Sequence, residues 1–576
     1  MYCGKQSIKK KNLFKRVTRH NRMSKYLSID EVPEELKAKL GKYFTNVGGS
    51  TFVIHGLPPE LTGGALARYS RAKTGIQLII LNEFLDEHGK PSQQKGSELM
   101  DRVLNAFGDD SVGELEGTHV GLENISQLLT KEIEDRRIGG SPIEQSTRYV
   151  IYDEKDKQGK WRYLRPREIT ESGLEEQYEK VNNKAFEVYS EGVQLLQNYF
   201  KKELPRNQFQ IEVEREGRKV KANESELQND GERKAFSIAY NFTIRCAALD
   251  VGRCLLPSST LTHLGVHGNG RYFSHLLSHL KSSELSEAQE RAVELEVELN
   301  KVIPTYIKRN KSNPKKAEIN RNMKQLSEGL FKNIKPHDDK VTLIPHTSYL
   351  HEVVASCLFS YTTVSLEQIE LVLCQLPKEK KLKILQTYKG NRESRRDKNG
   401  RGLEAGYPLT FDLIGGFAEY RDLERHRILT QQRQSLTTDL GFIVPPEMVE
   451  VGLEEKVKEV EGMMRSLNQD LRRAGLGEAA QYATLFNHRI RFMMGMNLRA
   501  FQHLAELRTQ PAGHYSYRSM VQEMVQKVEE RDPWTKEFLG YVDFSDPDNK
   551  ISRANEQARI AGKNLAAGID GNTDLE

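Results

Sequence analysis

The sequence predicts an α+β protein built from two tandem, helix-rich domains with small sheets, which pair as a pseudo-dimer. At 576 residues the chain is long for a single domain, so two domains are expected. Two segments, 136–149 and 425–435, each place arginines and a serine in a short span. Each is followed downstream by Asn-x-Arg, at 269–271 and at 497–499. A repeated arginine-rich pattern indicates two fused domains that build one anion-binding site jointly.

Apolar periodicity and chain-breaking residues predict the individual elements. In the first half we expect a helical lead-in and a strand at 51–54, helices at 64–86, 95–107 and 121–135, a loop around Pro142, a helix ending before Pro257, a helix opening near Asn269, and a charged helix over 281–332 with a linker at 308–324. In the second half we expect a strand at 341–344, a loop at 389–407, a strand-like run at 410–414 leading into the helix with Arg425, and helices over 468–508 and 516–531.

The domain boundaries follow from composition and spacing. We expect a basic disordered tail at 1–26, a first domain at 27–335, a second at 336–548 and a loose polar tail at 549–576. Arg137 lies 132 residues before Asn269, whereas Arg427 lies 70 before Asn497. The excess of 62 residues falls on a polar, helical insertion at about 155–235, which a surface position would tolerate.

Charge is unevenly distributed along the chain. The formal net charge is +5, but residues 1–26 hold nine lysines and arginines and no acid, so the remainder is slightly acidic. The tail fits a solvated leader, and the alternative is a weak phosphate or nucleic-acid contact. Because no aromatic-basic interleaving or zinc pattern accompanies it, we expect no nucleic-acid partner.

Composition also bears on compartment and metals. No run of eighteen apolar residues and no secretory signal is found, so we expect a cytoplasmic protein without a membrane span. The five cysteines form no C-x-x-C pair and suit buried apolar positions in a reducing compartment. Four histidines gather near one another, but no acid or cysteine accompanies them, so we expect no metal site; they are His263, His267, His275 and His279.

The second half carries the clearest chemical motif. Arg425 and Arg427 flank His426, and three potential cations in a row favour a bound anion, because arginine forks match phosphate. An exposed basic turn that pairs with local acids such as Glu424 is the alternative. Ser435 follows the triplet after a seven-residue spacer.

This R-H-R-x7-S pattern resembles the signature of the flavin-dependent thymidylate synthases. The run that begins Asn497-Leu498-Arg499 and ends at Arg508 is similar to a second family element, and Pro533-Trp534-Thr535 resembles its C-terminal part. In the first half, residues 144–149 resemble the close of the signature, and Arg253 begins an R-x-L-P element sixteen residues before Asn269.

Each half departs from the family pattern at different positions. In the first half, Asp135 and Arg136 replace the leading Arg and the His of the triplet, and Leu280 replaces the late arginine. In the second half, the serine loop lacks its arginine and Gln481 replaces the helix arginine. The losses are complementary, so the two halves together retain one full set and the mirror-image site lacks all four arginines.

The resemblance implies residue roles at one composite site. Arg508 is the catalytic group that favours the N3-deprotonated uracil, because a nearby cation stabilises an anion. The implied dUMP contacts are Glu144, Gln145, Ser146, Thr147, Arg148, Arg253, Asp422 and Arg425. The implied flavin contacts are Arg425, His426, Arg427, Ile428, Asn269, Arg271, His275, Asn497, Arg499 and His503. For His275 and His503 a purely structural role is an equal alternative.

The implied activity is reductive methylation of dUMP to dTMP with FAD as cofactor and with NADPH and methylenetetrahydrofolate as co-substrates. The family's tetramer implies a homodimer of this fused chain, a pseudo-tetramer. No cysteine nucleophile is needed, since reduced flavin carries the hydride. The alternative is a degenerate relative that binds a nucleotide or flavin without methyl transfer.

Overall fold

The computed structural model describes residues 26, 28–70, 72–86, 88–101, 113–136, 138–308, 314–346, 348–391, 400–549 and 551–568. All of the predicted basic tail except Tyr26 lies outside these ranges. The described residues fall into two compact units, here called unit 1 and unit 2. Unit 1 takes in the chain up to Thr118 with 269–271 and 298–309, and unit 2 takes in 119–268, 272–297 and the chain from Asn310.

Unit 1 is helical. Its helices are α1 (Glu34–Leu40), α2 (Pro59–Tyr69), α3 (Ile76–Ile79), a π-helical turn (Ile80–Phe84), α4 (Gln93–Asp101) and α11 (Pro304–Ile307). The apolar faces of α1, α2, α3 and the π-helical turn share a core that includes Leu61 and Phe84. The strand expected at 51–54 is reduced to a single bridge between Phe44 and Ile54.

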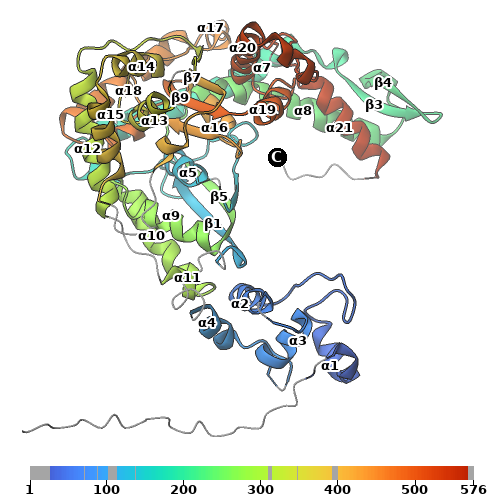
Figure 1. Cartoon of the computed structure of the whole chain (residues 1–576). Coiled ribbons are helices and arrows are strands. Elements are labelled where there is room, and N and C mark those ends of the chain that lie inside the picture. The colour runs from blue at the N-terminus through green and yellow to red at the C-terminus, as the bar shows by residue number, and fades with distance from the viewer. Residues whose placement is uncertain are drawn as a thin grey trace, which may run out of the picture. The chain divides into compact units, whose positions relative to one another are not determined.

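Unit 2 contains two small sheets, of three and four strands, and a two-stranded hairpin among helices, so the predicted helix-rich α+β class is confirmed (Figure 1). The three-stranded sheet has the order β1-β5-β2, and the four-stranded sheet has the order β6-β7-β9-β8. The strands are β1 (Gly117–Ser126), β2 (Gly140–Glu144), β5 (Leu261–Asn269), β6 (Val341–Leu343), β7 (Leu409–Gly416), β8 (Thr430–Arg433) and β9 (Arg489–Met496).

The helix expected at 121–135 begins later than predicted. Residues 117–126 form β1, and only Gln127–Glu134 form the helix α5. Ser126 sets this boundary, because its extended backbone ends the strand and its hydroxyl accepts a bond from the Leu129 amide at 2.9 Å. Pro142 lies in β2, an edge strand, where a missing amide donor is tolerated.

The expected helix over 468–508 is wrong in its middle. The chain there forms α18 (Glu454–Arg473), an internal strand β9 and then α19 (Leu498–Arg508). Residues 490–496 are all buried, so β9 shows no apolar-polar alternation and its sequence could not be distinguished from a buried helix. Asn497 starts α19 as its N-cap, accepting the Ala500 amide at 3.0 Å.

The insertion predicted at about 155–235 is only partly helical. It holds α6 (Arg167–Thr170), α7 (Glu175–Glu203), the hairpin β3 (Gln210–Arg215) with β4 (Arg218–Asn223), and the start of α8 (Asp230–Gly252).

The C-terminal segment expected to be loose forms α21 (Ala554–Ala566), which packs on β3 and α8 (Figure 1). Gly562 permits this approach, since a Cβ there would lie 2.5 Å from the Glu212 carbonyl oxygen.

The remaining helices complete unit 2. They are α9 (Gly270–Leu280), α10 (Ser286–Leu299), α12 (Pro314–Phe331), α13 (Tyr349–Phe359), α14 (Leu366–Cys374), α15 (Lys378–Lys389), α16 (Phe417–Leu423), α17 (Pro446–Glu450) and α20 (Tyr515–Arg531). The linker expected at 308–324 is therefore largely the helix α12. Over the described ranges, none of the helices combines the length and apolar character that a membrane span requires.

Segments from the two sequence halves pair directly in unit 2. The Ser258 amide donates to the Thr484 carbonyl at 2.8 Å, and the Phe486 amide donates to the Leu256 carbonyl at 2.9 Å. Between these bonds, Pro257 and Leu485 form an antiparallel bridge. We call these contacts, between 256–258 and 484–486, the seam. The seam fixes the backbone that follows Arg253 and Gln481.

Candidate functional site

Arg148 lies in the loop after β2 and is held by an aspartate of α8. Its Nε and Nη2 donate to the two carboxylate oxygens of Asp250 at 2.6 and 2.7 Å. The Ser146 hydroxyl accepts the Arg148 amide at 3.2 Å, which tightens the loop. Nη2 also reaches the Ala512 carbonyl at 3.5 Å, so this first-half arginine touches the second half.

Arg253 follows the last residue of α8 and is almost completely buried, at 1% exposure. Its Nη2 donates to Asp422 Oδ2 at 3.1 Å, across the two halves. Its Nε is buried without a hydrogen-bond partner. A buried, unpaired donor is costly, and an anionic ligand at this position would satisfy it.

Arg425 comes directly after α16 and its C-cap, in the turn that precedes β8, and it forms an ion pair with Glu144. Glu144 also pairs with Arg421 at 3.2 Å and with the buried Lys131 at 3.0 Å. Burial alone would raise the pKa of the Glu144 carboxyl, but Arg421, Lys131 and Arg425 hold it well below its usual range. Glu144 therefore remains charged and fixes the position of Arg425.

Arg508 ends α19, and His426 orients it. The Arg508 Nε donates to His426 Nε2 at 2.8 Å. Burial, with Arg508 as the second cause, lowers the pKa of His426 to about 3, so the imidazole is a neutral acceptor at neutral pH. The terminal nitrogens of Arg508 remain available for a ligand, and its guanidinium carbon lies 5.7 Å from the centre of the Tyr517 ring.

Asp422, which is 7% exposed, accepts a bond from Arg253, and three further arginines lie close enough to act on its carboxyl; two of the four come from each half. Burial alone would raise the pKa of its carboxyl, yet these arginines hold it well below the ordinary value. In order of decreasing effect they are Arg253, Arg148, Arg425 and Arg508. We call these five residues the Asp422 cluster.

The other predicted dUMP residues lie beside this cluster and bond mainly to protein. The Gln145 side-chain oxygen accepts the Tyr152 hydroxyl at 3.2 Å. The Thr147 hydroxyl accepts Arg421 Nη1 at 3.1 Å.

The predicted flavin residues of the second half lie on the triplet and on α19. Arg427 donates to the Ser141 hydroxyl at 3.0 Å, and Ile428 is 84% exposed. On α19, Asn497, Arg499 and His503 are exposed, and the His503 ring meets the His426 ring edge-on at 5.7 Å.

The predicted flavin residues of the first half lie elsewhere. Asn269 and Arg271 belong to unit 1, where Arg271 pairs with Glu114. His275 is on α9 in unit 2 and lines a cavity separate from the Asp422 cluster. The proposed flavin role of all three remains a prediction.

Comparison with known proteins identifies the family. The pattern of the family described as "Thymidylate synthase complementing protein" matches residues 59–305 and 407–534, well over half of the chain. The chain belongs to this family. Flavin-dependent thymidylate synthases form it, so the resemblance seen in the sequence is confirmed.

Relatives match over nearly their whole length. A UPF0159 protein of Chlamydia muridarum is 32% identical over 91% of this chain and 98% of its own, and one of Thermoplasma acidophilum is 30% identical over 88% and 99%. A crystal structure of Helicobacter pylori ThyX with FAD and dUMP is 20% identical and covers 43% of this chain and 91% of its own, with a TM-score of 0.22.

Several positions that depart from the family pattern line one cavity of about 460 Å³ in unit 2. They are Asp135, Arg136 and Gln481, and the signature serine Ser435 lines the cavity with them. We call this space the Asp135 cavity. Asp135 pairs there with Arg401, and Arg433 pairs with Glu132.

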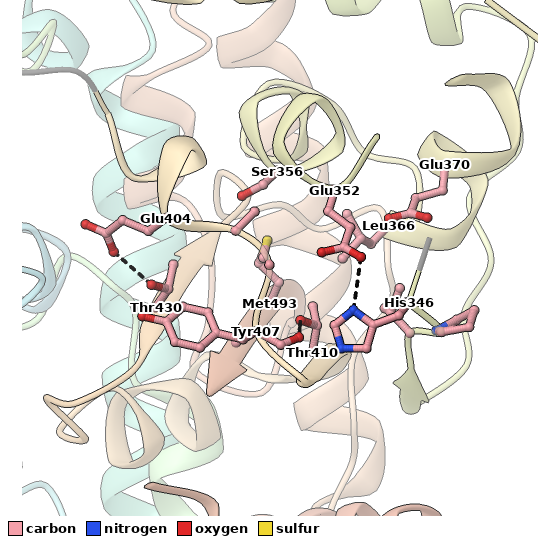
Figure 2. Close-up of a pocket in the computed structure, with 15 residues that line it drawn as sticks. His346, Glu352, Ser356, Leu366, Glu370, Glu404, Tyr407, Thr410, Thr430 and Met493 are labelled. Carbon is pink, nitrogen blue, oxygen red and sulfur yellow. Dashed lines mark hydrogen bonds and ion pairs between the residues drawn. The ribbon is translucent and has the colours of Figure 1, made fainter. Parts of the chain in front are cut away.

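Another, much smaller space of about 20 Å³ lies against β7 and β9 and has room for little more than water (Figure 2). His346 bonds Glu352 at 3.0 Å, and Glu404 accepts the Thr430 hydroxyl at 2.8 Å across it. No predicted site residue lines it.

The buried thiols are unreactive by environment, as expected from the sequence. Burial raises the pKa of Cys246 to about 11 and that of Cys357 to about 12. Cys254 is also buried, whereas Cys374 is exposed.

Sequence reasoning missed the groups that hold the arginines. Asp250 anchors Arg148, and His514 donates to the Asp250 carbonyl at 3.0 Å from the second half. Arg421 braces Glu144 and Thr147. Asp250 lies three residues before Arg253, and Arg421 lies four residues before Arg425. At these spacings each residue lies near a motif arginine at the end of a helix.

Proposed function

We propose that this chain is a flavin-dependent thymidylate synthase whose one complete dUMP site is the Asp422 cluster, shared by its two halves. The observation that carries the proposal is the bond across the halves from Arg253 to Asp422, with Arg148, Arg425 and Arg508 close enough to act on the same carboxylate. These are the four arginines that the complementary motif losses retain.

The seam between the halves supports a tandem pseudo-dimer. From Asn269 to Asn497 is 228 residues, and the same offset converts Pro257 into Leu485. It also converts the bond from Ser258 to Thr484 into the bond from Phe486 to Leu256. Reciprocal contacts of this kind are what a two-fold axis produces in a homodimer.

The charge of the site suits a nucleotide phosphate. Arg148, Arg253 and Arg425, with Arg421 and Arg508, bring five positive charges, and their paired carboxylates Asp250, Asp422 and Glu144 bring three negative ones. The guanidinium groups outnumber their carboxylate partners, which suits an anionic phosphate. Arg148, the unpaired Nε of Arg253 and the Ser146 loop would hold it.

Arg508 would act on the uracil ring. Its Nε is occupied by His426, so its terminal nitrogens can meet the N3–O2 edge. A guanidinium there stabilises the N3-deprotonated ring and makes C5 more nucleophilic. His426 is a positioning residue in this account, since it fixes the Arg508 fork while staying neutral.

The neighbouring surface fits an anionic, flat cofactor such as FAD. Exposed donors of Arg427, Asn497 and Arg499 lie with the exposed apolar Ile428 beside the triplet and on α19. When bound, the flavin would supply the hydride that completes methyl transfer. NADPH would reduce it, methylenetetrahydrofolate would supply the carbon, and the chain would form a homodimer.

Two features favour the runner-up function, that of a nucleotide-binding relative without methyl transfer. Arg148 is already bidentate to Asp250, and the chain lacks family arginines at Leu280 and Gln481.

The test is tritium release from 5-tritiated dUMP with FAD, NADPH and methylenetetrahydrofolate. Release that requires all three supports the enzyme. Binding of dUMP without release establishes the runner-up, and absence of both contradicts the site.

A further inference from the structure

The Asp135 cavity is positively charged although it lacks the family's nucleotide arginines. Among the described residues that line it, seven are lysine or arginine and four are carboxylates. Its volume of about 460 Å³ falls in the range of sites for small organic ligands. The first half contributes Arg136, and the second contributes Arg401 and Arg433.

Relative to the Asp422 cluster, acidic and basic residues are exchanged at two motif positions of the cavity. By motif position, Asp135 corresponds to Arg425, and Arg433 corresponds to Glu144. Arg425 and Glu144 form an ion pair in the Asp422 cluster, whereas in the cavity Asp135 pairs with Arg401 and Arg433 pairs with Glu132. Both cavity pairs still join the first half to the second, with acid and arginine exchanged at the two motif positions.

One cation in this cavity has a donor that the protein leaves unused. Arg136 Nη2 bonds the His279 ring at 2.8 Å, but its Nε is buried without a partner. Arg401 lies close enough to lower the pKa of Arg136, after burial and against the effect of Asp135. Crowded, incompletely paired guanidinium groups favour binding of an anion.

The lining of the cavity also includes aromatic and polar groups. Tyr361 and Tyr388 line it with ring centres 6.5 Å apart, and the Tyr361 hydroxyl donates to Asn320 at 2.9 Å. Lys324 of α12 also lines the cavity. A ligand that carries both a phosphate and a flat ring matches guanidinium groups and aromatic rings in one space.

We infer that the Asp135 cavity is a second ligand site that binds a nucleoside monophosphate, independently of the dUMP site. Arg136, Arg401 and Arg433 hold the phosphate, and the two tyrosines take the base. The selectivity differs from that of the Asp422 cluster, because the cavity has no counterpart of Arg148, Arg253 or Arg508.

The experiment is calorimetric titration of the full chain, saturated with dUMP, with AMP, GMP, CMP and dTMP in turn, and with orthophosphate. We expect one of the nucleotides to bind with one further equivalent per chain. Arg433→Gln and Lys324→Gln should each weaken that binding by about tenfold or more, leaving the dUMP titration of the unsaturated protein unchanged.

Lys332→Gln is the matched control, because Lys332 is exposed, follows α12 directly and does not line the cavity. Lys324 is partly exposed, so its substitution keeps the test valid should Arg433→Gln fail to fold. The inference is overturned by no nucleotide binding up to about 10 mM, by binding of orthophosphate alone, or by nucleotide binding that neither variant weakens. Because dUMP reports the Asp422 cluster separately, failure of the proposed function is distinguishable.

Discussion

The Asp422 cluster and the Asp135 cavity occupy corresponding motif positions of the two halves, and the charges at two of these positions are exchanged. In the cluster Arg425 of the triplet pairs with Glu144. In the cavity Asp135 stands at the triplet position and pairs with Arg401, and Arg433 stands at the position of Glu144 and pairs with Glu132. The cluster concentrates its cations on one carboxylate, Asp422. In the proposed tandem pseudo-dimer, fusion lets two related sites diverge, which identical subunits cannot do.

The largest effect is expected from removing the central carboxylate of the cluster. In Asp422→Asn, Arg253 loses its buried ionic partner, and breaking such a pair costs about 3–5 kcal/mol of folding stability. Thermal melting should show the loss, and added phosphate should recover more stability in the variant than in the wild type. Equal phosphate responses would mean that the arginines do not converge on one anion.

The next largest effect is expected on the catalytic rate constant kcat. Arg508→Ala should lower kcat by about a hundredfold to a thousandfold and change dUMP affinity much less, because ring ionisation is a demand of the transition state. Steady-state tritium release measures both. The control is Arg473→Ala, an exposed arginine at the end of α18, which should leave the kinetics unchanged. Full activity in Arg508→Ala would exclude it from catalysis.

Arg253→Ala tests whether Arg253 binds the phosphate of dUMP and affects the catalytic rate less. Loss of a charged hydrogen bond should weaken dUMP binding by about 1.5–3 kcal/mol, with a smaller effect on kcat. Equilibrium titration with dUMP, checked by circular dichroism for folding, measures this. An unchanged dissociation constant would place the phosphate elsewhere.

The smallest effect is on pH-dependent stability. Burial, then Arg253, lowers the pKa of His514 to about 3, whereas the unfolded value is 6.5. The unfolded chain therefore binds a proton first, and the free energy of unfolding falls as pH falls from about 6.5 toward 3. The slope is at most about 1.4 kcal/mol per pH unit for this group.

Urea unfolding at about pH 7.5, 6 and 5 tests the sign of this linkage. His514→Gln should reduce the slope below pH 6.5, because the variant lacks the proton-binding group. An identical slope in both proteins would show that His514 does not keep a depressed pKa.

Residue patterns predicted the fold class and the family but not every element. Short runs with strong caps or breakers were recognisable, such as the helix that opens near Asn269 and the helix over 515–531. β9 was missed because both its faces are buried, which removes the alternation that marks a strand. The helix α21 was missed because its packing partner, β3, is distant in the sequence.

The residues of the candidate site also fall into those that the sequence predicts and those that it does not. Motif arginines could be selected from the sequence, since each has a fixed spacing from an asparagine or serine. Their supports could not, because Asp250 is distant from Arg148 in the sequence, and His514 and Arg421 act through contacts between the halves that only the folded chain creates. The charge exchange between Glu144 and Arg433 also becomes meaningful only once the ion pair that each forms is known.

The most direct test of the shared site is a crystal structure of the chain with dUMP, together with the binding stoichiometry. The account predicts one dUMP per chain, its phosphate on Arg148 and Arg253 and its uracil on Arg508. A nucleotide contacted by arginines of one half alone, or two equivalent dUMP molecules per chain, would contradict it.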